Sequence, residues 1–247
     1  MPFTHDAYRD MLFAILDNRP ILTFRQADRI WHDPPARFCI LRHDVEWSVP
    51  AAVAMAKIDA EVGVKSTFLF RVSGPYNPFY ERTAPMIREI VGMGHELGLH
   101  YDCALIQGDR RALTAQLKAL ESTFGVIVDT VSPHQPNRGP VVDVPGWINA
   151  YDHRFFRNCE YASDSLQVWR DGGPLERLEH PRMQLLIHPD NWSESGDAWQ
   201  LLMVNELEAE HAETMVDAFV EMHRCERSID LRQSADKIMR ERLEASG

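Results

Sequence analysis

The stretch "RFCILRHDVEWSVPAAVAMAKIDAEVGVKSTFLFR", residues 37–71, decides the fold because it predicts a strand, a helix and a second strand in succession. Residues 37–44 are an apolar run rich in strand-forming side chains. Residues 48–64 carry helix signals at both ends, with Ser48 as the N-cap, a proline in the first turn and a glycine at the end. Residues 65–71 predict the second strand. A unit of this kind is typical of a chain that joins two parallel strands.

The alternation of strands and helices continues along the chain. Further strands are predicted at residues 95–100, 126–132, 159–165 and 183–189, and further helices at residues 6–17, 23–31, 79–94, 109–125, 196–224 and 228–243. The Pro-rich stretch 133–158 is too long for an ordinary connection, and such loops are often functional. The pattern predicts a parallel sheet with helices outside it, in which six or so strands close, or nearly close, into a barrel.

The composition excludes some classes of partner. The formal net charge of −11 argues against broad binding to nucleic acid or to anionic membranes, which need a basic surface. The chain shows no secretory signal at its start and no run near the ~20 apolar residues that span a bilayer. The four cysteines form no Cys-x-x-Cys pair, so we expect reduced, buried thiols and a cytoplasmic location, with one disulfide as the alternative.

Two histidines, His95 and His100, lie in the predicted strand "HELGLH". Successive side chains of a strand point to opposite faces, so a separation of five places these two histidines on opposite sides. They therefore cannot bind one metal together. His100, at the carboxyl end of the strand, is the candidate for chemistry, and His95 is expected to face outward without a chemical role.

Ionisable or metal-binding residues stand at the ends of six predicted strands, whose interiors are almost wholly apolar. They are Arg42, His43 and Asp44 with Glu46 just beyond, Arg71, His100 with Asp102, His134, Asp164, and His188. A parallel sheet brings its carboxyl ends to one face, where α/β folds bind their ligands. A single histidine at such a position is more often a hydrogen-bonded boundary residue than a ligand, and a single aspartate is often a helix cap. The coincidence of several on one face predicts a shared site.

Aspartate and histidine together are a ligand set for zinc and for other divalent first-row metals. No sulfur ligand except Cys103 lies near the predicted ligands, so a structural zinc cage is not expected. A site with one position open for water fits better. We therefore expect a divalent metal cofactor, zinc in the first place, with Mn, Ni, Fe or Co as alternatives.

Five short motifs, taken in their order and spacing, resemble those of the polysaccharide deacetylase-like superfamily, the carbohydrate esterases with the NodB-homology domain. The motifs are "LRHDV", "GHELGLHYD", "SPHQP", "YASDS" and "LLIHP", of which "GHELGLH" is the most specific. The resemblance covers roughly residues 37–192. It implies a distorted (β/α) barrel with about six to seven parallel strands and outer helices. We expect residues 1–36 to be an N-terminal helical extension, 37–195 the barrel, and 196–247 helices that pack on it.

The resemblance also implies roles for residues. In the family, an Asp-Asp pair ends the first strand, where the first residue is the catalytic base and the second binds the metal. The matching pair here is His43-Asp44, which places Asp44 on the ligand position and a histidine on the base position. The family then supplies two metal-binding histidines four residues apart. His100 matches the first of them, but the second falls on Ala104.

His134 is the candidate for the missing ligand, because it lies where the family has a motif beside the metal. Asp102 is the alternative, two residues beyond His100. His188 matches the family's histidine that protonates the leaving group, and Asp164 resembles the acid that orients it. The base would be His43, Glu46 or another nearby group.

These expectations lead to three hypotheses for the function. The first is a metal-dependent hydrolase that removes an acyl group from an amide nitrogen, on an N-acyl sugar or glycan intermediate. The second is a small-molecule amidase with the same chemistry. The third is a degenerate member that binds a glycan or ligand without turnover, to which the departures at His43 and Ala104 give weight. The apolar stripe of the C-terminal helix is expected to cover the barrel, with a homodimer contact as the alternative.

Overall fold

The computed structural model describes residues 1–169 and 172–205. The chain forms two compact units, residues 1–199 and 200–247. In the second unit the described residues, 200–205, are helical. The predicted helix at 228–243, most of the helix at 196–224 and their packing lie outside the described residues, as does Cys225. None of the helices in the described part of the chain is long and apolar enough to cross a membrane.

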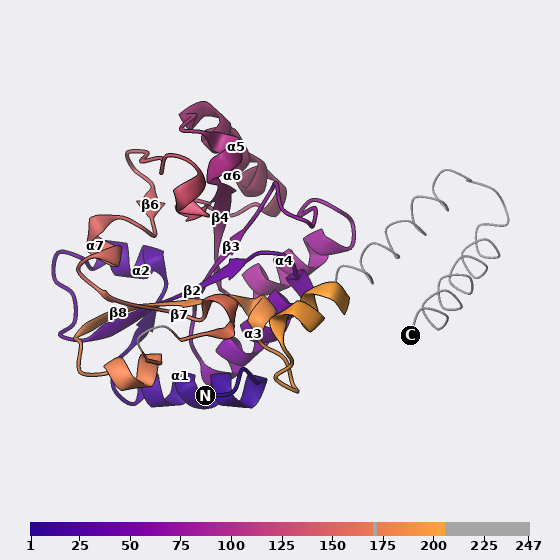
Figure 1. Ribbon diagram of the computed structural model, residues 1–247. Coiled ribbons are helices and arrows are strands. Elements are labelled where there is room, and N and C mark those ends of the chain that lie inside the picture. The colour runs from indigo at the N-terminus through magenta and orange to yellow at the C-terminus, as the bar shows by residue number, and fades with distance from the viewer. Residues whose placement is uncertain (170–171, 206–247) are drawn as a thin grey trace, which may run out of the picture. The chain divides into compact units, whose positions relative to one another are not determined.

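The first unit is built around one sheet in which every strand pair is parallel. The strands are β1 (Ile21–Leu22), β2 (Phe38–Val45), β3 (Thr67–Phe70), β4 (Glu96–Asp102), β5 (Thr130–His134), β6 (Ile148–Asn149), β7 (Glu160–Ser163) and β8 (Arg182–Ile187). Their order is β6-β5-β4-β3-β2-β8-β7, and the two-residue β1 pairs with β2 (Figure 1). The sheet curls enough for Ser132 of β5 to contact Asp44 of β2, although two strands lie between them. The predicted α/β fold, a distorted barrel of parallel strands, is confirmed.

The helices follow the predicted alternation. They are α1 (His5–Leu16), α2 (Phe24–Arg29), α3 (Val49–Val62), α4 (Thr83–Gly92), α5 (Cys103–Ile106), α6 (Arg110–Phe124) and α7 (His153–Phe156), with 3₁₀ turns η1 (Pro136–Arg138), η2 (Ser165–Gln167), η3 (Pro174–Arg177) and η4 (Pro189–Asn191). Helix α3 begins and ends as its sequence predicts. Ser48 accepts a hydrogen bond from the Ala51 amide, and Gly63 ends the helix in the left-handed conformation at φ 86°.

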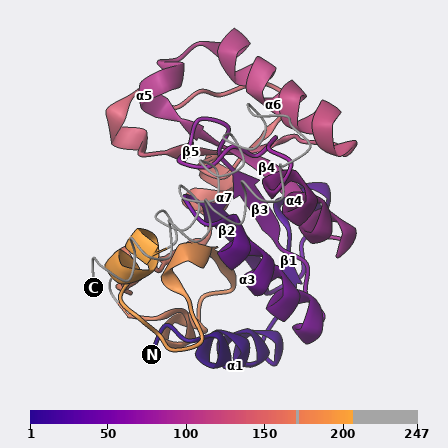
Figure 2. The same ribbon diagram turned by 90° about the vertical axis from the view of Figure 1, so that its right-hand side faces the viewer.

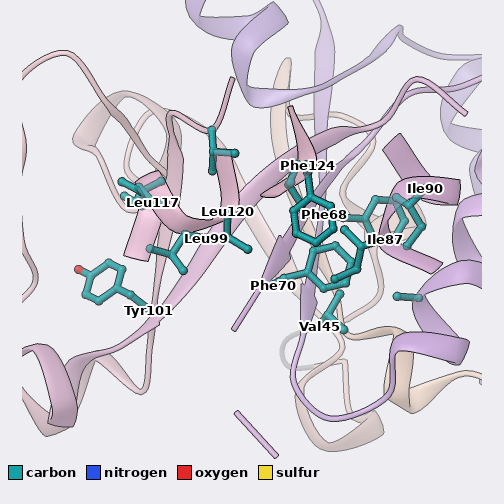
Figure 3. Close-up of a cluster of buried hydrophobic side chains, with 14 of the residues drawn as sticks. Val45, Phe68, Phe70, Ile87, Ile90, Leu99, Tyr101, Leu117, Leu120 and Phe124 are labelled. Atoms are coloured by element: carbon teal, nitrogen blue, oxygen red, sulfur yellow. The ribbon is translucent and has the colours of Figure 1, made fainter. Parts of the chain in front are cut away.

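Odd and even residues of β2 face different layers. Leu41 lies in an apolar cluster with α1 and α3, and Val45 lies in a second cluster with α3, α4 and α6. Figure 2 shows α1 and α3 side by side, and Figure 3 shows the second cluster around Val45, Phe70 and Leu120. Phe38 and Ile40 lie on the other face, in a third cluster with α2 and α7. We call the side that carries Phe38 and Ile40 the inner face of the sheet.

The inner face changes character along β2. Phe38 and Ile40 fill its amino-terminal half, whereas Arg42 and Asp44 occupy its carboxyl-terminal half and are buried. Helix α2 closes the amino-terminal end, where the amide of Phe24 donates to Thr67 Oγ1 at 3.1 Å. An apolar floor below a polar upper half therefore leaves the carboxyl ends of the strands as the place for chemistry.

Replacement of Leu120 tests the packing of the outer layer. Leu120 of α6 has no exposed surface. The Leu120→Ala variant should lose about 2–5 kcal/mol of unfolding free energy, because it removes buried methyl groups and leaves a cavity. Ile127→Ala is the control, since this side chain is 60% exposed, and it should change stability by about 0.5 kcal/mol or less. Urea unfolding measures both, and equal losses would contradict this packing.

Candidate metal centre

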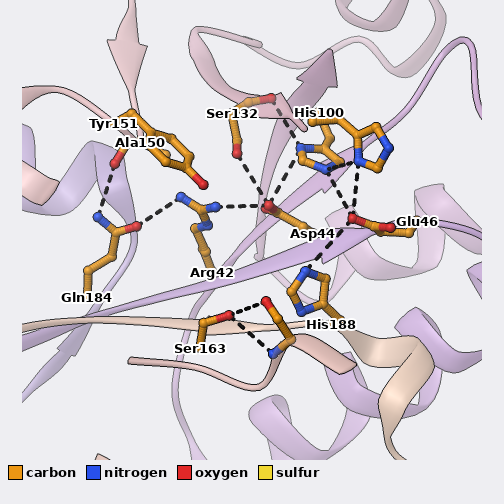
Figure 4. A network of polar contacts seen from close by, with 12 residues as sticks. Arg42, Asp44, Glu46, His100, Ser132, Ala150, Tyr151, Ser163, Gln184 and His188 are labelled. Atoms are coloured by element: carbon orange, nitrogen blue, oxygen red, sulfur yellow. Dashed lines mark hydrogen bonds and ion pairs between the residues drawn. The ribbon is translucent and has the colours of Figure 1, made fainter. Parts of the chain in front are cut away.

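A buried ion pair occupies the upper part of the inner face. Arg42 Nη2 donates to Asp44 Oδ2 at 2.9 Å, and neither side chain is more than 2% exposed. Arg42 Nη1 donates to Gln184 Oε1 at 2.9 Å (Figure 4). Gln184 in turn donates to the carbonyl oxygens of Ala150 and Phe155 at 3.0 and 2.9 Å. The guanidinium is thus fixed from the side of β8, and it fixes Asp44.

Asp44 is ionised in this environment. Burial alone would raise the pKa of its carboxyl, but the attraction of Arg42 and His100 outweighs that effect and holds the pKa below its ordinary value. Ser132 Oγ donates to the same oxygen, Oδ2, at 3.3 Å. The other oxygen, Oδ1, is buried and has no hydrogen-bond partner among the described residues. A buried carboxylate oxygen of this kind is able to accept a proton or a hydrogen bond from a ligand.

Three potential metal ligands meet beside this ion pair, one from each of three segments. They are Glu46, just beyond β2, His100 of β4 and His134 of β5, whose ligand atoms all lie within 4.8 Å of one another. His134 Nδ1 is 3.2 Å from both Glu46 Oε1 and His100 Nε2. His100 Nε2 is 3.6 Å from Glu46 Oε1. Among the described residues, no other group of this kind comes together.

The orientation of His100 is set from its other nitrogen. His100 Nδ1 lies 3.1 Å from the carbonyl oxygen of Ser132. A carbonyl only accepts, so Nδ1 carries a proton, and Nε2 is the nitrogen that faces Glu46 and His134. Two imidazole nitrogens and one carboxylate oxygen are a donor set for a divalent metal with an open position. The residues present therefore fit such an ion.

Glu46 is also ionised. Burial opposes its charge, but the hydrogen bonds to His100 and His134 and the nearby His188 hold the pKa of its carboxyl far below the ordinary range. The charged carboxylate therefore lies where the ring nitrogens of His100 and His134 meet it.

A histidine–aspartate pair completes the site on the side of β8. His188 Nδ1 lies 2.6 Å from Asp164 Oδ1, and His188 Nε2 lies 3.8 Å from Glu46 Oε1. Trp192 Nε1 donates to Asp164 Oδ2 at 2.7 Å, which holds the carboxylate in place. Burial would lower the pKa of His188, but Asp164, together with Glu46 and Asp44, raises it to about 9. The imidazole is therefore protonated at neutral pH, with Nε2 directed toward the ligand group.

His43, predicted as a base, lies apart from the other candidate residues. Its side chain lies on the outer face of β2, where Nε2 is 2.9 Å from Asp59 Oδ2. Its ring stacks on Phe68 with 4.2 Å between centroids, and it has no exposed surface. His43 is consecutive with Asp44 in the strand, so the two side chains point to opposite faces. His43 therefore lies on the opposite face of the sheet from Asp44 and the potential metal ligands.

The group of three potential ligands includes two of the predicted metal ligands, His100 and His134. The three-ligand group contains Glu46, the residue expected to act as a base, whereas the expected ligand Asp44 lies beside it with an oxygen 3.5 Å from His100 Nδ1. Asp102, the alternative to His134, caps α5 instead through the amides of Ala104 and Leu105. Its other oxygen is 3.4 Å from Arg71 Nη2.

The strand-end histidines come together at one end of the sheet, as the sequence suggests. His100, His134 and His188 each place a ring nitrogen within 3.8 Å of Glu46 Oε1, and His188 contacts Asp164. His95 lies on the opposite face from His100, buried, with Nε2 3.0 Å from the carbonyl oxygen of Ala56 in α3. Sequence reasoning missed Gln184 as the group that holds Arg42. Its position in an apolar strand, at even spacing from His188, is the signal that places it on the same face.

Comparison with known proteins adds the following. No family model matches the sequence, and no curated protein sequence matches it. Six solved chains match the structure. A CE4 family pseudoenzyme from Bacillus anthracis and its mutant with restored enzymatic activity are 17% and 16% identical with TM-scores of 0.41. The matches cover 71% and 72% of this chain, which spans less than two thirds of the length of those chains, 62% and 65%.

Other matches cover more of the neighbour. The Xyl-CE4 domain of a multidomain xylanase from the hindgut metagenome of Trinervitermes trinervoides is 18% identical, with a TM-score of 0.42 over 71% of this chain and 85% of its own. The chitin deacetylase of Colletotrichum lindemuthianum is 15% identical, with a TM-score of 0.39 over 78% and 86%. At such identities and TM-scores the likeness extends to the fold alone.

Metal affinity distinguishes the two acidic residues. Glu46→Gln, His100→Ala and His134→Ala should each weaken zinc binding by more than the ~10–100-fold that loss of a merely orienting group costs, because each removes a ligand atom. Asp44→Asn should stay within about that 10–100-fold range. Competition with a chromophoric chelator measures the affinities. If Asp44→Asn binds no zinc while Glu46→Gln binds it normally, this ligand group is contradicted, and Asp44 is the ligand, as the motifs imply.

The protonation of His188 is open to direct measurement by NMR titration of the metal-free protein. Its imidazole should titrate with a pKa of about 9. In Asp164→Asn the pKa should fall, because the carboxylate that stabilises the charged form is gone and burial favours the neutral form. The basic form should then appear at lower pH than in the wild type. Equal midpoints in the two proteins would contradict the assigned pair.

Proposed function

We propose that the protein is a metal-dependent hydrolase that cleaves a non-peptide amide bond, removing the acyl group from an N-acyl sugar or glycan intermediate. The observation that carries the proposal is a metal-ligand group flanked by two ionised or protonated partners. Glu46, His100 and His134 form the group. Asp44 lies on one side with a carboxylate oxygen that has no partner among the described residues, and protonated His188 lies on the other.

The metal proposed is zinc, because two imidazoles and one carboxylate with an open position are its usual catalytic ligands. The same donors also accept Mn, Fe, Co or Ni. Such a cation, when bound, polarises the acyl carbonyl and acidifies water. Glu46, His100 Nε2 and His134 Nδ1 are the atoms that would hold it.

Asp44 is proposed as the general base. Its pKa is held below the ordinary value, so it is ionised at neutral pH and able to accept a proton. Oδ2 is occupied by Arg42 and Ser132, whereas Oδ1 is without a partner among the described residues. This division leaves one oxygen fixed and one oxygen for the proton of the attacking water. Arg42 orients Asp44 and keeps it ionised.

His188 is proposed as the general acid. The nitrogen of an amide leaves readily only after it has received a proton, and His188 Nε2–H faces the ligand group. Asp164 holds the ring through Nδ1 and stabilises its charge. The base on β2 and the acid at the end of β8 therefore face the amide bond from two sides.

The substrate class rests on the resemblance of the motifs, and the same chemistry would serve a small-molecule amidase. The third hypothesis, binding without turnover, arose from His43 and Ala104. The family's base position and its second histidine position each have a substitute candidate in this chain. Asp44 has the properties of a base, and His134 completes the set of three potential ligands. That observation favours turnover.

Acid release from N-acetylated hexosamines and chito-oligosaccharides, measured with zinc-loaded protein, tests the proposal. Asp44→Asn and His188→Ala should each lower kcat by about 10²–10⁴-fold, since each loses one proton transfer. Both variants should still bind zinc. His43→Asn is the control, because this residue lies on the outer face, and it should retain kcat once folded. Wild-type protein that holds one zinc per chain and hydrolyses no N-acyl compound of the panel would support the binding hypothesis instead.

A further inference from the structure

The five residues after β8, "HPDNW" at positions 188–192, connect several parts of the site. His188 is the proposed acid. Asn191 Nδ2 donates to the carbonyl oxygen of Asp164 at 2.8 Å, and Trp192 Nε1 donates to its carboxylate. These contacts hold Asp164, which holds His188. The remaining polar residue of the segment, Asp190, has no part in that pair.

Asp190 bonds to the segment that carries Glu46. Its Oδ2 accepts from the amide of Glu46 at 3.1 Å, and its Oδ1 accepts from the amide of Ser48 at 2.7 Å. Asp190 is 2% exposed, so these bonds are shielded from water. Both ends of the tripeptide 46–48 are therefore attached to one carboxylate from a distant part of the chain.

The tripeptide needs such support because the sheet does not provide it. The ladder between β2 and β3 ends at the pair Val45 and Phe70, one residue before Glu46. Helix α3 begins at Val49, with Ser48 as its N-cap. Between them the backbone has neither strand nor helix geometry. The direction of the Glu46 side chain depends on how this short turn is held.

We propose that Asp190 is a positioning residue, whose carboxylate fixes the backbone of residues 46–48 and so places Glu46 between His100 and His134. The role rests on the proposed metal centre. It also means that one segment supplies the acid and positions a metal ligand, so the distance between the two is set by the 188–192 backbone. A side chain that only stabilised the turn would affect folding without affecting metal affinity.

Two measurements on the full chain test the proposal. Asp190→Ala should weaken zinc affinity by about 10–100-fold, the range for loss of a group that orients a ligand. Amide hydrogen exchange by NMR on metal-free protein should show faster exchange at Glu46 and Ser48, with the strand amides of β2 unchanged. Asp190→Asn keeps the shape but presents an NH₂ group to one of the two donors, so it should be affected in the same direction and less strongly. If Asp190→Ala does not fold, the same two measurements on Asp190→Asn test the proposal.

Asp109→Ala is the matched control. Asp109 likewise accepts two backbone N–H bonds before a helix, from Arg111 and Ala112, but at α6. The Asp109→Ala variant should have the zinc affinity of the wild type and the same exchange rates at the Glu46 and Ser48 amides. Unchanged affinity or unchanged amide exchange in folded Asp190 variants would overturn the proposal, even if the melting temperature falls. Wild-type protein that binds no zinc would instead overturn the metal centre, while the amide exchange would still decide whether Asp190 holds the turn.

Discussion

The ion pair between Arg42 and Asp44, buried on the inner face of β2, is the constraint on which the rest of the site depends. Loss of one partner from a buried pair costs about 3–5 kcal/mol, because the other charge is left uncompensated. Here Gln184 and Ser132 provide the additional hydrogen bonds that such a pair needs. Because Arg42 occupies one oxygen of Asp44, this carboxylate is fixed as a neighbour of the proposed metal ligands, of which Glu46 is one.

The chemistry follows from how a curled parallel sheet brings distant strand ends together. His100 and His134 come from neighbouring strands, Glu46 from the turn after β2, and His188 from the end of β8. The apolar floor below them and the outer helices keep these ends in place. An ionised carboxylate and a protonated imidazole then face one group of potential ligands, as the proposed hydrolysis of an amide requires.

The sequence predicts the fold well because its signals are local. The caps of α3 and the alternation of strands and helices need no distant contact, and the strand-end positions of His100, His134 and His188 follow from them. The alternation that separates His95 from His100 also separates His43 from Asp44, so the outward direction of the His43 side chain follows from the sequence as well.

The assignment of Glu46 was not open to the same reasoning. Side-chain direction is periodic only while the strand lasts, and β2 ends at Val45. Beyond it, the direction of Glu46 depends on Asp190, 144 residues further along the chain. A zinc-bound crystal structure with anomalous diffraction tests this assignment most directly. We predict an ion about 2.0–2.2 Å from the Glu46 carboxylate, His100 Nε2 and His134 Nδ1, with Asp44 outside bonding distance. An ion bonded to Asp44 with Glu46 turned away would contradict it.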